Sequence, residues 1–189
     1  MKIAFIGAQG VGKTTLCAAI TKEFKNSHIV KESVRECPYP CDQRADFKTE
    51  WWVLSHSILA EQEARESKCP LIVTDRSLLD IAVFTKLINE TGDGRITNIQ
   101  RAMIEDSIVK WHEEDPYDHV FFVKVNPEIW KTRDLDDGFR SLDIGWYTLL
   151  TKEFELAIER LNIAKMTKIH TIENNGDFDT CLKNVISAL

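Results

Sequence analysis

Apolar residues along the chain fall into short, nearly continuous runs that alternate with longer stretches in which they recur at helical spacing. Short runs rich in β-branched and aromatic residues are typical of strands buried on both faces. Such runs predict strands at 2–7, 28–32, 70–75, 119–125 and 168–173. The amphipathic stretches predict helices at 13–25, 48–66, 78–89, 96–113, 142–161 and 178–189. This alternation indicates an α/β fold with a parallel sheet and crossover helices.

The composition is that of a globular protein, with 43% hydrophobic and 29% charged residues. Without an internal repeat or long linker, residues 1–189 are expected to form one domain. The 24 basic and 30 acidic residues give a net charge of −6, which disfavours an extensive nucleic-acid interface. With no apolar run near the ~20 residues of a membrane span and no signal-peptide pattern, a cytoplasmic protein without membrane contact is expected. The five cysteines lack metal-ligand spacing and are expected to be reduced thiols.

The first predicted strand leads into a glycine-rich stretch that directly precedes the first predicted helix. Its spacing, Gly-x-x-x-x-Gly-Lys-Thr, is that of a phosphate-binding loop, or P-loop, whose backbone wraps an anion and aims N–H groups inward. Lys13 is expected to reach the β- and γ-phosphates of ATP, and the Thr14 hydroxyl to bind Mg²⁺. The residues expected to hold the nucleotide are Gly7, Ala8, Gln9, Gly10, Val11, Gly12, Lys13, Thr14 and Thr15.

The third predicted strand ends in Thr-Asp-Arg-Ser. A carboxylate that ends a buried strand beside a P-loop completes the Mg²⁺ site, and Asp75 is expected to fill this role. Motor ATPases usually follow this acid with a second carboxylate that activates water, whereas here Arg76 follows. A guanidinium fork suits a transferring phosphoryl group or an acceptor substrate. The alternative for Arg76 is a surface ion pair with Asp80, one helical turn further on.

GTPases of the common type carry a guanine-reading Asn-Lys-x-Asp after a later strand. The fourth predicted strand of this chain is followed by Asn-Pro-Glu-Ile-Trp, at 126–130. A guanine-specific GTPase is therefore excluded.

With these motifs the chain resembles the P-loop kinases of the nucleoside and nucleotide kinase group. The pattern Lys-Glu-Ser-Val-Arg at 31–35, then an aromatic helix, then Thr-Asp-Arg-Ser, is most similar to the NadR-like ATPase/kinase family. That family includes nicotinamide-riboside kinase domains and several phage-encoded kinases. The resemblance covers most of the chain. It implies a three-layer P-loop NTPase fold, with a five-stranded parallel sheet in the order 2-3-1-4-5 and helices on both faces.

The second predicted strand ends in Glu32, beside the P-loop if the resemblance holds. In deoxynucleoside kinases a glutamate at this place takes the proton of the attacking hydroxyl, so the resemblance implies that Glu32 is the catalytic base. A weak base that orients the hydroxyl suffices because phosphoryl transfer has a loose transition state. Two alternatives remain open: Glu32 as a solvated acid that caps the next helix, and Asp75 as the base.

The segment of about 33–66 is expected to form the acceptor site. It begins with an irregular Cys-Pro-Tyr-Pro-Cys stretch, whose prolines exclude a regular helix. Arg35 and Arg44 flank this stretch and are expected to contact the acceptor. The helix that follows carries Trp51 and Trp52; Trp52 is expected to stack on a planar base, with two core tryptophans as the alternative.

A charged segment of about 131–141 follows the fourth predicted strand. The resembled kinases carry arginines here, in a lid that closes over the triphosphate and neutralises charge as it moves to the leaving oxygen. Arg133 and Arg140 lie on either side of Asp137-Gly138, a pair that favours a turn. We expect Arg133 to bind the nucleotide and Arg140 to act in catalysis; a solvated loop is the alternative.

These residues favour an ATP- and Mg²⁺-dependent kinase that transfers the γ-phosphoryl group to a hydroxyl of a nucleoside- or nucleotide-like acceptor. One alternative is a phage-type DNA kinase acting on 5-hydroxymethyluracil or on a polynucleotide end. Lys31, Arg35, Arg44 and Lys48 would give it a small basic face, although the net charge of −6 disfavours DNA. The other alternative is a regulatory module in which bound ATP switches a surface that contacts a partner.

Overall fold

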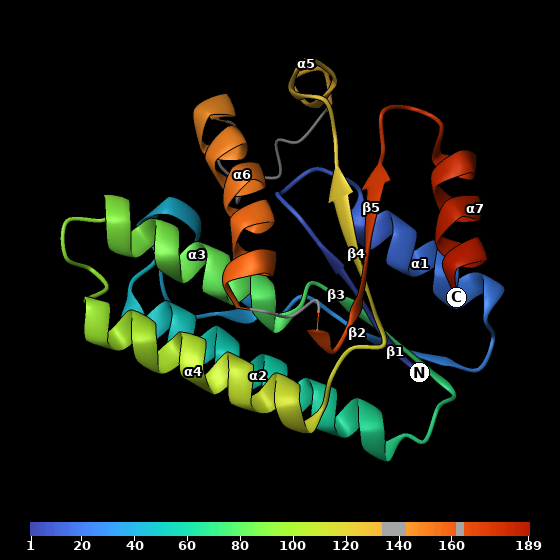
Figure 1. The fold of residues 1–189 in the computed structure, drawn as a ribbon, viewed down its shortest axis with the longest axis horizontal. Helices are drawn as coiled ribbons and strands as arrows, with labels where there is room; N and C mark the ends of the chain where they lie inside the picture. Colours follow the sequence, from blue (N-terminus) through green and yellow to red (C-terminus); the bar gives the residue numbers. More distant parts are fainter. Residues whose placement is uncertain (134–142, 162–164) are drawn as a thin grey trace.

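The structure is a computed structural model of the chain and describes residues 1–133, 143–161 and 165–189. Among these residues, five strands form one parallel sheet in the order β2-β3-β1-β4-β5 (Figure 1). This confirms the strand order implied by the family resemblance. The strands are β1 (Lys2–Ile6), β2 (Ser27–Val30), β3 (Leu71–Asp75), β4 (His119–Lys124) and β5 (Lys168–Glu173).

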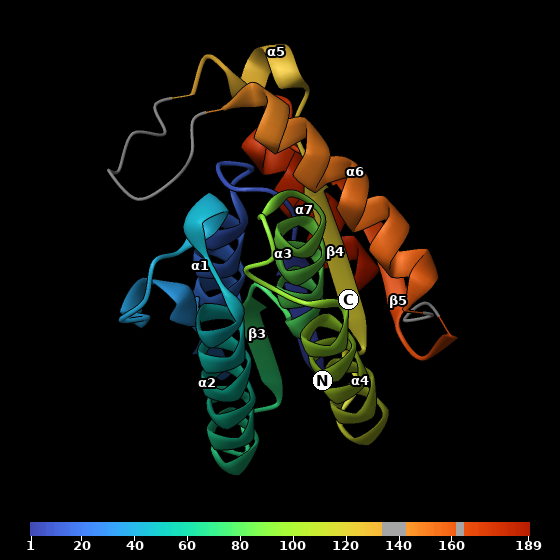
Figure 2. The ribbon, with the colours of Figure 1, turned by 90° about the vertical axis from the view of Figure 1, so that its left-hand side faces the viewer.

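Helices cover both faces of the sheet and complete the three layers (Figures 1 and 2). On one side lie α1 (Lys13–Glu23) and α7 (Phe178–Ala188), and on the other α2 (Phe47–Glu66), α3 (Leu78–Thr91), α4 (Asn98–Glu114) and α6 (Ile144–Arg160). The short elements are η1 (Ser33–Glu36), η2 (Asp42–Arg44) and α5 (Pro127–Trp130). Within the described ranges, we find no helix with the length and apolarity of a membrane-spanning segment.

The central strands are buried along their whole length, as their continuous apolarity predicts. Phe5 in β1 stacks on Phe121 in β4, with ring centroids 5.2 Å apart. Close packing of this kind fixes side chains in single arrangements. The central strands therefore give a rigid base to the loops at their carboxyl ends.

Hydrogen-bonded caps set where the two helices of the acceptor region begin. The Asp46 side chain accepts from the backbone N–H groups of Lys48 (2.9 Å) and Thr49 (3.1 Å) at the start of α2. At the start of α3, the Asp80 carboxylate accepts from the backbone N–H of Ser77 at 2.8 Å. Each cap satisfies N–H groups that have no partner inside the helix, and so fixes which side chains of α2 and α3 turn inward.

Only some of the large apolar side chains of α2 are buried. Leu54 is 2% exposed, but Trp51 and Leu59 are 41% and 54% exposed. The helix packs through Val53 and Leu54 against α3 and α4. Because successive residues differ by 100° around a helix axis, this phase turns Trp51 and Leu59 toward solvent.

The strand register explains which residues meet at the carboxyl edge of the sheet. Phe5 pairs with Asp75, and Val30 pairs with Thr74. The second residue after Val30 is Glu32 and the second after Thr74 is Arg76, so these two follow neighbouring strands at the same level. Open α/β sheets bind their ligands at this edge.

Candidate active site

Lys13 lies inside the loop that the sequence predicts to hold phosphate. Its ammonium group donates to the carbonyl oxygens of Gly7 at 2.7 Å and Ala8 at 2.8 Å. Burial, together with the positive charge of Arg76, lowers the pKa of Lys13 to about 8, although nearby carboxylates oppose the shift. A polyanion at this place would stabilise the charged form of Lys13.

Three side chains from the second half of the chain hold carbonyl groups of the loop. Trp130 Nε1 donates to the carbonyl of Gln9, Arg133 Nη1 to that of Gly10 and Asn174 Nδ2 to that of Val11, each at 2.8 Å. In a trans peptide the N–H points opposite to the C=O, so these contacts turn the N–H groups of the following residues toward the other side of the loop. Backbone N–H groups presented in this way form an anion-binding concavity.

Two glycines are required by close approaches within this loop. Gly7 has φ +136°, and a Cβ there would lie 2.4 Å from the carbonyl oxygen of Val123. Gly12 has φ +99°, and its Cβ would lie 2.5 Å from Nδ2 of Asn174. The same amide holds the Val11 carbonyl, so it cannot move aside without loss of that hydrogen bond.

We expect Gly12→Ala to weaken ATP binding about tenfold or more, which corresponds to about 1.4 kcal/mol for each factor of ten. The matched control is Gly94→Ala: Gly94 has φ +81°, but no described atom lies within 4 Å of its added Cβ. Both substitutions place a Cβ on a residue with positive φ, which costs about 1–2 kcal/mol, so both variants should have a lower free energy of unfolding than the native protein. Titration calorimetry with ATP should show weaker binding in the Gly12 variant alone, and equal ATP affinities would contradict this account of the loop.

A cavity of about 250 Å³ lies above the loop. The residues that line it are Gln9, Gly10, Gly12, Lys13, Thr14, Thr15, Glu32, Asp75, Arg76 and Arg133. The remaining predicted loop residues, Gly7, Ala8 and Val11, are buried behind it. The Thr14 hydroxyl and the Asp75 carboxylate supply oxygen ligands of the kind that Mg²⁺ prefers, and they line the same cavity. The residues present therefore fit a Mg²⁺-bound triphosphate.

Arg76 points inward and bridges two carboxylates. Its Nε donates to Glu32 Oε1, and its Nη1 lies 3.0 Å from Asp80 Oδ1. The pair with Asp80 forms as the alternative prediction had it, but it is not a surface pair, because the Arg76 and Asp80 side chains are only 18% and 3% exposed. The two carboxylates outweigh burial and raise the pKa of Arg76.

The backbone of Arg76 adopts φ +84°, which is unusual for a residue other than glycine. Such a conformation costs of order 1–3 kcal/mol and is found where function requires it. Here it directs the guanidinium between Glu32 and Asp80, above the first turn of α3.

Glu32 precedes η1, but its side chain does not cap this turn. It faces Arg76 instead, and Arg35 Nε lies 3.5 Å from its second oxygen. Burial favours the neutral acid, but Arg76 and Lys13 outweigh this effect and lower the pKa of Glu32. Glu32 is therefore an ionised carboxylate at neutral pH.

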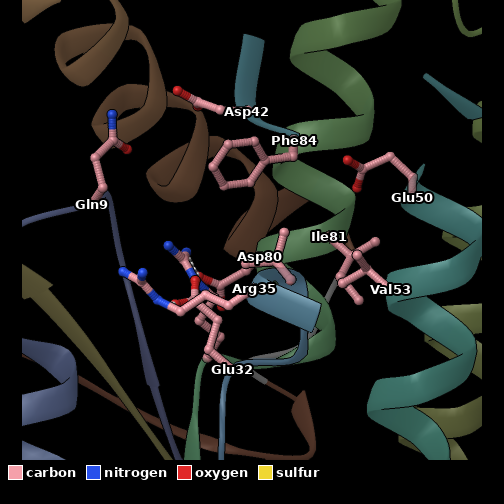
Figure 3. A pocket seen from close by; sticks show the side chains of 11 residues that line it. Gln9, Glu32, Arg35, Asp42, Glu50, Val53, Asp80, Ile81 and Phe84 are labelled. Carbon is pink, nitrogen blue, oxygen red and sulfur yellow. Dashed lines mark hydrogen bonds and ion pairs between the residues drawn. The ribbon is translucent and has the colours of Figure 1, made fainter. Parts of the chain in front are cut away.

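A second cavity opens between α2 and α3 and adjoins the first, since Gln9, Glu32 and Arg76 line both (Figure 3). Figure 3 shows side chains from both helices directed into this space, which we call the acceptor pocket. The lining residues are Gln9, Glu32, Val34, Arg35, Asp42, Glu50, Val53, Arg76, Asp80, Ile81 and Phe84.

The structure brings only part of the expected acceptor set to this pocket. Arg35 lines it, but Arg44 is an exposed residue of η2 outside the lining. Trp52 also lies outside the lining: it packs against the cluster around Val53 and stacks on His56, with ring centroids 3.5 Å apart. The phase of α2 explains this, because it turns Val53 rather than Trp52 toward the pocket. Arg140 falls outside the described residues.

Several pocket and loop residues were not predicted. Glu50, Asp80 and Phe84 line the pocket, and Trp130 and Asn174 hold the loop. For Glu50 the sequence carried a signal: it lies three and four residues before Val53 and Leu54, on the buried face of α2. The others depend on contacts between distant segments.

Fold and site together define a P-loop nucleotide-binding protein with a second pocket beside its phosphate cavity. A family model described as "AAA domain" matches residues 2–163. The chain belongs to this family, in agreement with the resemblance drawn from its motifs.

Solved structures with the same fold are nucleoside and nucleotide kinases. Deoxyadenosine kinase from M. mycoides with bound dCTP is 22% identical and has a TM-score of 0.73, covering 100% of this chain and 98% of that one. The same enzyme with dCMP and a flexible dCDP is 21% identical over the same shares, with a TM-score of 0.74. Thymidylate kinase from Candida albicans is 16% identical, with a TM-score of 0.74, covering 99% of this chain and 89% of that one. No curated protein sequence matches the chain.

Proposed function

We propose that the protein is an ATP- and Mg²⁺-dependent kinase that transfers the γ-phosphoryl group of ATP to a hydroxyl of a neutral, nucleoside-like acceptor. The observation that carries this proposal is the position of the Glu32–Arg76 pair. Both residues line the phosphate cavity and the acceptor pocket, so they stand where a phosphoryl group would pass from one to the other. The kinases with the same fold support the proposal.

Each group of the phosphate cavity has a role in this proposal. The loop N–H groups and Lys13 bind the phosphates, and Arg133 donates to the Gly10 carbonyl and lines the same cavity. Thr14 and Asp75 hold Mg²⁺, which would neutralise charge on the β- and γ-phosphate oxygens. Arg76 stabilises the charge that spreads over the transferring group.

Glu32 orients the acceptor. Its carboxylate accepts a hydrogen bond from the acceptor hydroxyl, whose oxygen forms the new P–O bond as the bond to the ADP oxygen breaks. The hydroxyl proton passes to Glu32 and then to solvent. Glu32 suits this task because its lowered pKa keeps it ionised beforehand. Asp75 is the rival base, but the metal competes for it.

The charges of the acceptor pocket favour a neutral acceptor over a phosphorylated one. Its lining carries the carboxyl groups of four residues, Glu32, Asp42, Glu50 and Asp80, and the guanidinium groups of two, Arg35 and Arg76. Both guanidinium groups already contact Glu32. A monophosphate would bring two more negative charges next to guanidinium groups that Glu32 already engages.

The test is a phosphoryl-transfer assay with γ-labelled ATP and a panel of acceptors. The panel contains ribo- and deoxynucleosides, their monophosphates and DNA with 5-hydroxymethyluracil. We expect ADP to form in a one-to-one ratio with a phosphorylated nucleoside, with little free phosphate. Label in the monophosphates or the DNA alone would overturn the acceptor class. ADP release that matches phosphate release with every acceptor would overturn the kinase, and ATP binding without ADP release would indicate a regulatory module.

A further inference from the structure

Glu50 is a buried acid that the proposed transfer reaction does not use. It lies in the first turn of α2, lines the acceptor pocket and is 5% exposed. Figure 3 shows its side chain extending from α2 toward α3. It does not line the phosphate cavity, so it is not placed to take a proton from the attacking hydroxyl.

Within the described part of the chain, Glu50 forms no salt bridge. Thr85 on α3 lies near it, and the buried Thr85 hydroxyl has no hydrogen-bond partner among the described residues. Burial, with a small contribution from Asp46, raises the pKa of Glu50 to about 8, although Thr85 and the charge of Arg76 oppose the shift. At neutral pH Glu50 is therefore mainly a neutral carboxylic acid, which donates one hydrogen bond and accepts another.

Apolar side chains flank this acid. Val53 of α2 and Ile81 and Phe84 of α3 line the same pocket. Apolar walls with a few polar groups suit a planar ring whose edge carries the hydrogen-bonding groups. With a hydroxyl held at Glu32, the ring of a nucleoside-like acceptor would extend toward Glu50.

We propose that Glu50, as a neutral acid, selects an acceptor whose heterocycle presents a hydrogen-bond donor next to an acceptor. This inference rests on the proposed function. Lactam edges, as in uracil, and amidine edges, as in adenine and cytosine, both offer this pattern. Guanine offers the lactam pattern at O6 and N1–H, but its other edge, with the adjacent donors N1–H and N2–H, would instead require the carboxylate.

Several titratable and charged groups lie around Glu50 in the acceptor pocket. The titratable and charged groups around it are Asp46 at the N-cap of α2, Cys41 before η2, Asp42 in η2, Glu32 before η1, Arg35 in η1, Arg76 before α3 and Asp80 in the first turn of α3. Burial raises the pKa of Cys41 to about 12, so this thiol stays neutral. Burial also raises the pKa of Asp80, although the charges of Arg76 and Lys13 oppose this shift. Replacement of Glu50 by glutamine leaves all of these groups in place, so a pH dependence that this substitution removes belongs to Glu50.

The decisive comparison is Glu50→Gln with Glu50→Ala. An amide, like the neutral acid, donates one hydrogen bond and accepts another, whereas alanine does neither. Binding of adenosine, cytidine, uridine and guanosine is measured by calorimetry without ATP, between pH 6 and 9.5. Glu63→Gln, an exposed acid on the same helix, is the matched control.

At pH 7 we expect the alanine variant to bind the preferred nucleoside about tenfold or more weakly, and the glutamine variant within about threefold of the native protein. Above pH 8 the native affinity should fall as Glu50 ionises, while that of the glutamine variant stays flat. A glutamine variant as weak as the alanine variant at pH 7 would overturn the proposal. So would a preference for guanosine that strengthens above pH 8.

Unfolding measured against pH provides a check that needs no ligand. A carboxyl group with a raised pKa binds more protons in the folded state, so its contribution to stability falls as pH rises from its unfolded pKa to about 8. Glu50→Gln should therefore gain stability relative to the native protein between pH 5 and 8. If the free energies of unfolding of the two proteins differ by the same amount from pH 5 to 8, Glu50 is ionised throughout this range, and the proposal is wrong.

These experiments distinguish a failure of the proposed kinase from a failure of the inference about Glu50. If nucleosides bind as expected but no phosphoryl transfer occurs, the proposed kinase is wrong and base selection by Glu50 stands. If transfer occurs and Glu50→Ala leaves the Kd and the KM of the acceptor unchanged, the inference about Glu50 alone is wrong.

Discussion

Glu32→Gln is expected to lower kcat about 10³-fold while changing the affinity for ATP by no more than about twofold. The amide keeps the size of the side chain but cannot take the proton of the acceptor hydroxyl. ATP binding depends on the loop N–H groups and Lys13, which this substitution leaves in place. The measurement is steady-state turnover with the preferred acceptor, together with calorimetric titration of ATP.

The control for this variant is Glu36→Gln, an exposed acid at the end of η1 that lines neither cavity. Its kcat should equal that of the native protein. Normal turnover in Glu32→Gln would remove Glu32 as the base and leave Asp75, which lines the phosphate cavity, as the next residue to test.

The nucleotide side of the site could be predicted because it depends on contiguous residues. A buried strand, a glycine loop and a helix start carry the phosphate cradle within Gly7–Thr15, and Asp75 and Arg76 end the next buried strand. Once the strands are parallel and neighbours, their ends meet at one edge, so Glu32 and Arg76 come together without further information. The strand order itself came from the family resemblance.

The acceptor side could be predicted only in part because it depends on helix phase and on long-range packing. Aromatic composition favoured Trp52 as a pocket residue, but the Asp46 cap and the packing against α3 turn Val53 and Glu50 inward. Asp42, which lines the pocket, also accepts a hydrogen bond from Trp146 Nε1 at 2.8 Å, 104 residues away. No local pattern indicates a contact of this kind.

Arg76 links the two sides of the site, and its neighbours explain why a charge alone would not replace it. One nitrogen of its fork meets Glu32, on the acceptor path, and another meets Asp80, which also caps α3. A single ammonium group holds one of these carboxylates well but not both in a fixed geometry. The orientation of the Arg76 guanidinium is therefore fixed by the start of α3, the helix that forms one wall of the acceptor pocket.

Arg76→Lys is accordingly expected to lower kcat about 10²–10³-fold while the protein stays folded. Lysine keeps the positive charge beside Glu32 and Asp80 and adopts the same backbone angle at the same cost, so the substitution isolates the guanidinium fork. Without the fork, Glu32 is no longer held toward the acceptor, and one donor to the transferring group is lost. Turnover at saturating ATP and acceptor measures the effect.

The matched control is Arg101→Lys, in which the replaced arginine pairs with Glu105 one turn further along α4, at 3.1 Å. It also removes a guanidinium fork from an ion pair between residues four apart, but Arg101 lines neither cavity, so its kcat should stay within about twofold of the native value. A native kcat in Arg76→Lys would mean that Arg76 only stabilises the start of α3. In that case the fork has no part in phosphoryl transfer, and the position of Arg76 between the two cavities would no longer support the proposed kinase.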